Sequence, residues 1–66
     1  MRFKEIRTEH GQTLVVNAHD IVVLEPKDKT WDTGGIVWLR EGSCRYTNLF
    51  IDAAQAQAIR TWLMAV

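Results

Sequence analysis

The residues of this chain that are best suited to chemistry are aromatic and arginine side chains near its middle. They are Trp31, Trp38, Arg40, Arg45 and Tyr46. Tryptophan and arginine often dominate the binding energy at protein interfaces, and aromatic rings with arginines also bind single-stranded nucleic acids. These five are therefore the predicted interaction residues, for a protein partner or, alternatively, for a nucleic acid.

Metal binding and catalysis require polar side chains that converge, and the sequence offers few of them. His10, His19 and Cys44 are widely spaced, whereas zinc ligands usually occur as close pairs. No nucleophile motif surrounds Cys44, and the Gly34–Gly35 pair precedes a predicted strand instead of a phosphate-binding helix. We therefore expect no enzyme activity, no cofactor and no catalytic or metal-binding residue. A module that binds a metal ion or a small ligand weakly ranks third, after protein binding and nucleic-acid binding.

The composition is that of one small globular domain without a charge bias. The chain has 66 residues, of which 47% are hydrophobic, and its eight basic residues balance its eight acidic ones. A protein that binds the phosphate backbone normally has a basic excess, so this balance favours a protein partner. The chain lacks a transmembrane-length apolar run and a signal-peptide pattern, and it has a single cysteine. We expect one cytoplasmic domain over residues 1–66 with no membrane partner.

Apolar patterns and turn residues predict five strands and one helix. The strands are expected at about residues 2–8, 12–17, 20–25, 35–40 and 44–48, and the helix at about residues 52–65. The sequence contains no strand–helix–strand pattern, which excludes a doubly wound parallel sheet. The predicted fold class is α+β: an antiparallel sheet or half-barrel of about five strands with the C-terminal helix packed on it.

Local signals mark the ends of these elements. Residues 17–20 predict a bend in which side chains bond to the backbone, and Pro26 ends the third strand. Asp52 and Gln55 have the spacing of a capping box, in which Asp52 accepts from the Gln55 amide and the Gln55 side chain reaches back. The predicted apolar stripe of the helix consists of Ala58, Ile59, Trp62, Leu63 and Val66.

The third and fourth strands are predicted to be apolar on both faces. Side chains alternate along a strand, and residues 21–24 and 36–39 are all apolar. One short helix covers only one face, so the other must close into a barrel, lie under the loop of residues 27–35, or pack on another chain. A domain of this size is marginally stable alone. We therefore expect a homo-oligomer, most simply a dimer.

Two placements remain open for the tryptophan in the polar loop. Trp31 either folds back over the sheet or stays exposed as the anchor of an interface. Arg40 and Arg45 flank the predicted turn at residues 41–43 and are expected to be cross-strand neighbours. Their positions decide whether the interaction residues form one surface.

The segment from Leu14 to Glu25, with the sequence LVVNAHDIVVLE, has a family resemblance. A strand, an Asn-led bend, an isoleucine and a strand ending in Glu resemble the small flagellar and swarming-motility proteins of the FlbD/SwrD type. The order of elements over residues 12–66 is also similar to that of short prophage-encoded proteins. The resemblance implies a non-enzymatic protein and no catalytic residue.

These observations support one leading hypothesis and one alternative. The leading hypothesis is a non-enzymatic, cytoplasmic bacterial protein of phage or prophage type that binds another protein and acts as a homo-oligomer. The alternative is a small nucleic-acid-binding regulator that uses Arg40, Arg45 and the nearby aromatic residues.

Overall fold

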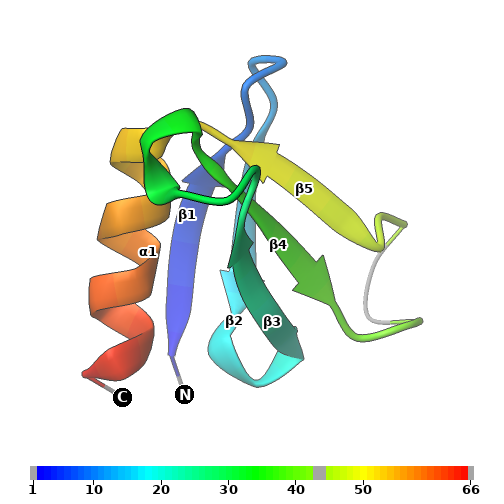
Figure 1. Cartoon of the computed structure of the whole chain (residues 1–66). Coiled ribbons are helices and arrows are strands. Elements are labelled where there is room, and N and C mark those ends of the chain that lie inside the picture. Colours follow the sequence, from blue (N-terminus) through cyan, green and yellow to red (C-terminus); the bar gives the residue numbers. More distant parts are fainter. Residues whose placement is uncertain (1, 43–44, 66) are drawn as a thin grey trace.

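The computed structural model describes residues 2–42 and 45–65 of the chain. In that part, the elements are β1 (Phe3–Arg7), β2 (Thr13–Asn17), the 3₁₀ turn η1 (Ala18–Asp20), β3 (Ile21–Pro26), the 3₁₀ turn η2 (Trp31–Thr33), β4 (Gly35–Leu39), β5 (Asn48–Ile51) and α1 (Ala53–Met64). The antiparallel strands and the C-terminal helix confirm the predicted α+β fold class (Figure 1). Cys44 and Val66 lie outside the described residues.

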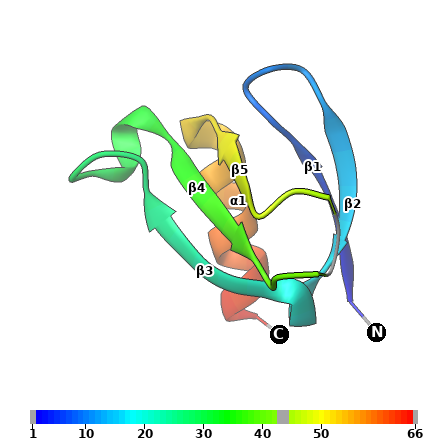
Figure 2. The same ribbon diagram turned by 90° about the vertical axis from the view of Figure 1, so that its right-hand side faces the viewer.

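The described strands form two antiparallel sheets. β1 and β2 form a hairpin, and the second sheet has the strand order β3-β4-β5. Figure 2 shows the hairpin and the second sheet as two walls, with α1 behind them. The Glu9 amide donates to the carbonyl of Phe50 at 2.9 Å, which ties the turn of the hairpin to β5.

The two sheets separate at the bend after β2. The Oδ1 atom of Asn17 accepts from the amide of His19 at 3.0 Å and caps η1. This bond confirms the predicted side-chain interaction at the bend. Because η1 redirects the chain here, β3 pairs with β4 and not with β2.

One face of each sheet points into a common core with the helix. Alternation along the strands turns Ile6 and Val16 inward from the hairpin, and α1 contributes Ala56 and Ile59. The second sheet contributes Val37, Leu39, Leu49 and Ile51, which are also buried. Removal of these apolar surfaces from water is the main favourable term in folding.

The helix begins where the sequence predicts, but one of its capping bonds is different. Asp52 Oδ1 accepts from the Gln55 amide at 2.8 Å, which confirms one half of the predicted capping box. The Gln55 side chain does not complete the box. Its Oε1 atom accepts from the Arg7 amide at 3.2 Å, and this bond ties the first turn of α1 to the end of β1.

The buried face of α1 differs from the predicted stripe at one alanine. Ile59 is fully buried and Trp62 and Leu63 pack partly against the core, but Ala58 is exposed. Ala56, which the stripe omits, is fully buried. A Cβ at Gly35 would lie 3.2 Å from the Ala56 Cβ, so the close approach of β4 leaves room for only a small side chain at position 56.

The fifth strand lies later in the chain than predicted. It was expected at residues 44–48, whereas β5 spans Asn48–Ile51. The pairing Val37 with Leu49 and Gly35 with Ile51 buries two large aliphatic side chains against the core. Hydrophobic burial therefore selects this later register over the earlier segment, which has good strand propensity but less apolar surface to bury.

A β-bulge changes the faces of the third strand. Ile21 pairs with Leu39 and Val23 with Trp38, so one extra residue stands in β3 opposite β4. Ile21 and Leu24 pack against the core, while Val22 and Val23 are both exposed. The expected simple alternation along residues 21–24 is wrong for this reason, because a bulge shifts the side-chain parity of a strand.

Candidate protein-interaction surfaces

The side of the β3–β4–β5 sheet that points away from the core is rich in apolar side chains. We call it the outer sheet face, and it consists of Val22, Val23, Glu25, Ile36, Trp38 and Phe50. Val22 is 65% exposed, Val23 45% and Trp38 37%. Ile36 and Phe50 are half-buried. The predicted second apolar face of this sheet is thus present, and the described residues leave part of it open to solvent.

Trp38 is the central aromatic residue of the outer sheet face. Its cross-strand partners are Val23 on β3 and Asn48 on β5. Its indole Nε1 donates to Glu25 Oε1 at 2.6 Å, which holds the ring in one orientation. An ordered, partly exposed tryptophan among aliphatic residues has the composition of an interface hot spot.

Ion pairs lie at both ends of the outer sheet face. Beyond the end of β3, Lys27 Nζ lies 2.5 Å from Glu9 Oε2 and 5.8 Å from the centroid of the Phe50 ring. At the opposite end, Arg40 Nη2 lies 3.0 Å from Asp20 Oδ1. Each of these cations has a carboxylate partner, so the two pairs together add no net charge to the margin of the face.

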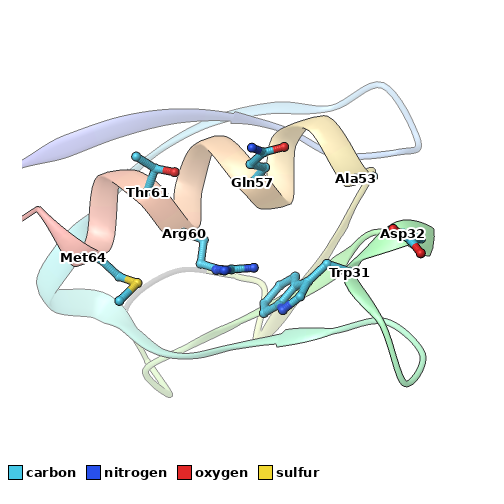
Figure 3. Close-up of a pocket in the computed structure, with 7 residues that line it drawn as sticks. All are labelled: Trp31, Asp32, Ala53, Gln57, Arg60, Thr61 and Met64. Atoms are coloured by element: carbon cyan, nitrogen blue, oxygen red, sulfur yellow. The ribbon is translucent and has the colours of Figure 1, made fainter.

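Trp31 folds back toward α1 and not over the outer sheet face. It is half-buried against the core, and the guanidinium carbon of Arg60 lies 4.9 Å from its ring centroid (Figure 3). Gly34, with φ 115°, brings the chain to this position, because a Cβ there would lie 2.3 Å from the Ile51 carbonyl oxygen. Of the two predicted placements, the structure has the folded-back one, with the ring between α1 and the start of β4 and not over the outer sheet face.

The other predicted interaction residues are not among the residues that form the outer sheet face with Trp38. Tyr46 packs partly against the core, and its hydroxyl oxygen accepts from Gln12 Nε2 at 3.1 Å. Arg40 interacts with Asp20 and donates to a backbone carbonyl of η1 at 2.6 Å. Arg45 is exposed. Since β5 begins only at residue 48, Arg40 and Arg45 are not cross-strand neighbours, and that expectation is wrong.

Two residues of the candidate surfaces, Phe50 and Arg60, were not predicted from the sequence. Phe50 joins the outer sheet face because its neighbours in β5, Leu49 and Ile51, point inward. Alternation alone would have found it once the strand was placed correctly. Arg60 contacts Trp31 from a distant part of the chain, and no local pattern signals that contact.

Among residues 2–42 and 45–65, no three His, Cys, Asp or Glu side chains are grouped so that they would hold a metal ion. His10 and His19 are exposed, in the turn after β1 and in η1. No described helix has the length and apolar character needed to cross a membrane.

The surfaces of the chain are the basis for a functional assignment. The outer sheet face offers exposed apolar area, and the Trp31–Arg60 contact offers an arginine on an aromatic ring. Comparison with family models, with curated proteins and with solved structures found no match for this chain.

Proposed function

We propose that this chain is a non-enzymatic interaction protein that forms a two-fold dimer through its outer sheet face. The observation that carries this proposal is the cluster of Val22, Val23 and Trp38, which are exposed side by side on one sheet. Apolar area exposed on a monomer is energetically unfavourable in water and is removed by association. Clustering of this kind is typical of protein-interaction surfaces.

Charge balance favours a second copy of the chain as the occupant of this face. The Glu9–Lys27 and Asp20–Arg40 pairs at its ends are each neutral, and the whole chain has a formal net charge of zero. Glu25 is then the one charged residue among those of the face, and its carboxylate accepts a hydrogen bond from the Trp38 indole, so the repulsion between two such faces is limited to one pair of like charges. A two-fold axis uses the same patch on both subunits, and the added burial stabilises a domain of this small size.

The dimer is tested by one substitution with a closely matched control. Val23→Lys places a charge next to Trp38 on the outer sheet face. Val15→Lys makes the same chemical change on β2, in the other sheet, where Val15 is also exposed, at 64%. Sedimentation velocity from low micromolar to near-millimolar concentration gives the mass of each protein, and circular dichroism verifies that each is folded.

We expect the wild type and Val15→Lys to be dimers and Val23→Lys to be a monomer. The amine of that lysine would have to lose its hydration in the interface, which opposes association strongly. A monomeric wild type over the whole concentration range contradicts the proposal. Equal effects of the two lysines also contradict it, since they would place the interface elsewhere.

The alternative, nucleic-acid binding, has less support. Arg40 is paired with Asp20, and the Trp38 indole lies beside the Glu25 carboxylate, which repels phosphate. Arg45 alone is a weak basis for contact with a polyanion, because affinity for the backbone grows with the number of phosphates neutralised. Salt-dependent binding to mixed-sequence oligonucleotides that is lost in Arg40→Gln or Arg45→Gln would favour this alternative over the dimer as the primary function.

A further inference from the structure

A groove of about 340 Å³ runs along α1 on the side that faces η2 (Figure 3). Its lining combines an indole ring, a guanidinium, a carboxylate, an amide, a hydroxyl and a thioether. These residues are Trp31, Asp32, Ala53, Gln57, Arg60, Thr61 and Met64. Mixed apolar and polar linings of this kind are typical of sites that fix the orientation of a bound group. Its lining shares no residue with the outer sheet face.

The aromatic floor of this groove is held firmly in place. Trp31 packs against the core, and a Cβ at Gly35 would lie 3.3 Å from its Cζ3 atom, so the ring lies close to the backbone of β4. The Arg60 guanidinium lies over the ring at 4.9 Å, within the range of a cation–π interaction. The ring therefore restricts the guanidinium before any ligand binds.

Arg60 is available for an anion. It is the one charged residue of α1, and in the described part of the chain the ion pairs involve Lys27 and Arg40 but not Arg60. Arg60 is also exposed. A planar guanidinium matches a carboxylate with two parallel hydrogen bonds.

We propose that this groove binds an acidic side chain in an extended segment of a partner protein. Arg60 would hold the carboxylate, and an apolar side chain next to it in that segment would lie on Trp31 and on Met64, which is 81% exposed. Tryptophan and arginine are the residue types most enriched at binding hot spots. The inference extends the proposed function by a second surface for a foreign partner, and it does not require the dimer.

A single carboxylate fits this site better than a nucleic acid does. The groove has one cation, and Asp32 in its lining carries the opposite charge. A polyphosphate backbone is held by several cations together, whereas one arginine suffices for one carboxylate. Asp32, in the same lining, would repel a second negative charge in the bound segment. A segment with one isolated acidic residue is therefore the expected ligand.

The test uses two short peptides that differ in charge alone. The tetrapeptides acetyl-Ser-Leu-Glu-Ser-amide and acetyl-Ser-Leu-Gln-Ser-amide are titrated to millimolar concentration into ¹⁵N-labelled full-length protein. Chemical shifts of the Arg60 Nε–H and the Trp31 indole N–H report the groove, and the Trp38 indole N–H reports the outer sheet face. Sodium acetate and a mixed-sequence single-stranded oligonucleotide are titrated separately.

Two variants distinguish binding in the groove from a general effect of the net charge of the protein. Arg60→Gln removes the proposed ligand, and Lys29→Gln makes the same change of net charge at an exposed residue of the nearby loop. Thermal unfolding verifies that both are folded. The monomeric Val23→Lys protein is titrated as well, so that failure of the dimer and failure of the groove are seen independently.

We expect the Glu peptide to shift Arg60 and Trp31 and to bind about two- to fivefold more tightly than the Gln peptide, the range for a solvent-exposed ion pair. Arg60→Gln should lose this preference, while Lys29→Gln and Val23→Lys keep it. Equal binding of both peptides, no shifts at millimolar peptide, or shifts confined to Trp38 overturn the proposal. Shifts that acetate reproduces in full, or tighter binding of the oligonucleotide, overturn the assignment to an acidic protein segment.

Discussion

Replacement of Gly34 by alanine tests how the loop before β4 is held against β5 and α1. Gly34 has φ 115° and ψ −164°, a region of backbone conformation that is almost restricted to glycine. A Cβ added at Gly34 would lie 2.3 Å from the carbonyl oxygen of Ile51 and 3.3 Å from Asp52 Cα. Gly34→Ala therefore has both a conformational and a steric cost.

The magnitude follows from these two terms. A residue forced into a glycine-only conformation costs about 1–3 kcal/mol, and overpacking against the backbone adds a further cost of about 1–3 kcal/mol. We expect Gly34→Ala to lower the free energy of unfolding by about 3 kcal/mol or more. A single core in a chain this short supplies about 3–5 kcal/mol, so most of the stability would be lost.

Gly11→Ala is the matched control for this substitution. Gly11 has φ 88°, but no atom lies within 4 Å of its hypothetical Cβ, so only the conformational cost of about 1–2 kcal/mol applies. Both substitutions reduce the entropy of the unfolded chain equally, and this term cancels in the comparison. The difference between the two variants therefore isolates the close approach at Ile51.

Urea unfolding followed by far-ultraviolet circular dichroism, at one fixed protein concentration, measures both variants. Gly34→Ala should unfold about 4–24 °C below Gly11→Ala in a parallel thermal scan, since the isolated steric term is about 1–3 kcal/mol and 1 kcal/mol corresponds to about 4–8 °C at this size. Equal stability of the two variants would refute the reasoning. It would mean that the backbone of η2 does not lie against β5 as described.

Three further experiments test other parts of the fold. Ile59→Ala should lower the free energy of unfolding by about 2–5 kcal/mol because Ile59 is fully buried, whereas Met64→Ala on the same helix should change it by less than about 0.5 kcal/mol; urea titrations that give equal losses would contradict the assigned helix face. Asp52→Ala should cost about 0.5–2 kcal/mol and Asp52→Asn much less, because asparagine can still cap the Gln55 amide; thermal scans distinguish them. Lys27→Met should change stability by no more than about 1 kcal/mol at low salt and less at high salt, because the pair with Glu9 is partly exposed; a larger, salt-independent loss measured by urea unfolding would show that Lys27 acts through packing.

The fold class could be predicted from the chain because its signals are local. Turn residues and alternation predicted the first four strands to within about two residues, and the Asp52–Gln55 spacing predicted the start of the helix. The fifth strand was placed too early, since Leu49 and Ile51 gain their burial only by pairing with β4. That gain depends on segments far apart in the sequence, so strand propensity alone did not indicate it.

The candidate surfaces could be predicted from the sequence less completely than the fold class, because they depend on the tertiary structure. Trp38 was predicted as an interaction residue, and its place on the outer sheet face agrees with the apolar pattern of β4. Tyr46 was grouped with it, but packs toward the core. Tyr46 lies outside the strands, between β4 and β5, so alternation along a strand does not set the direction of its side chain.

By itself, the sequence determined that this small, charge-balanced chain would form an antiparallel sheet with one capped helix, and that the third and fourth strands would be apolar on both faces. Only the tertiary structure decided that η1 divides the strands into two sheets, that a bulge exposes both Val22 and Val23, and that Trp31 meets Arg60. The physical reason is that hydrogen-bonding and capping preferences act between near neighbours. Burial and ring contacts, in contrast, are decided by which distant segments the core brings together.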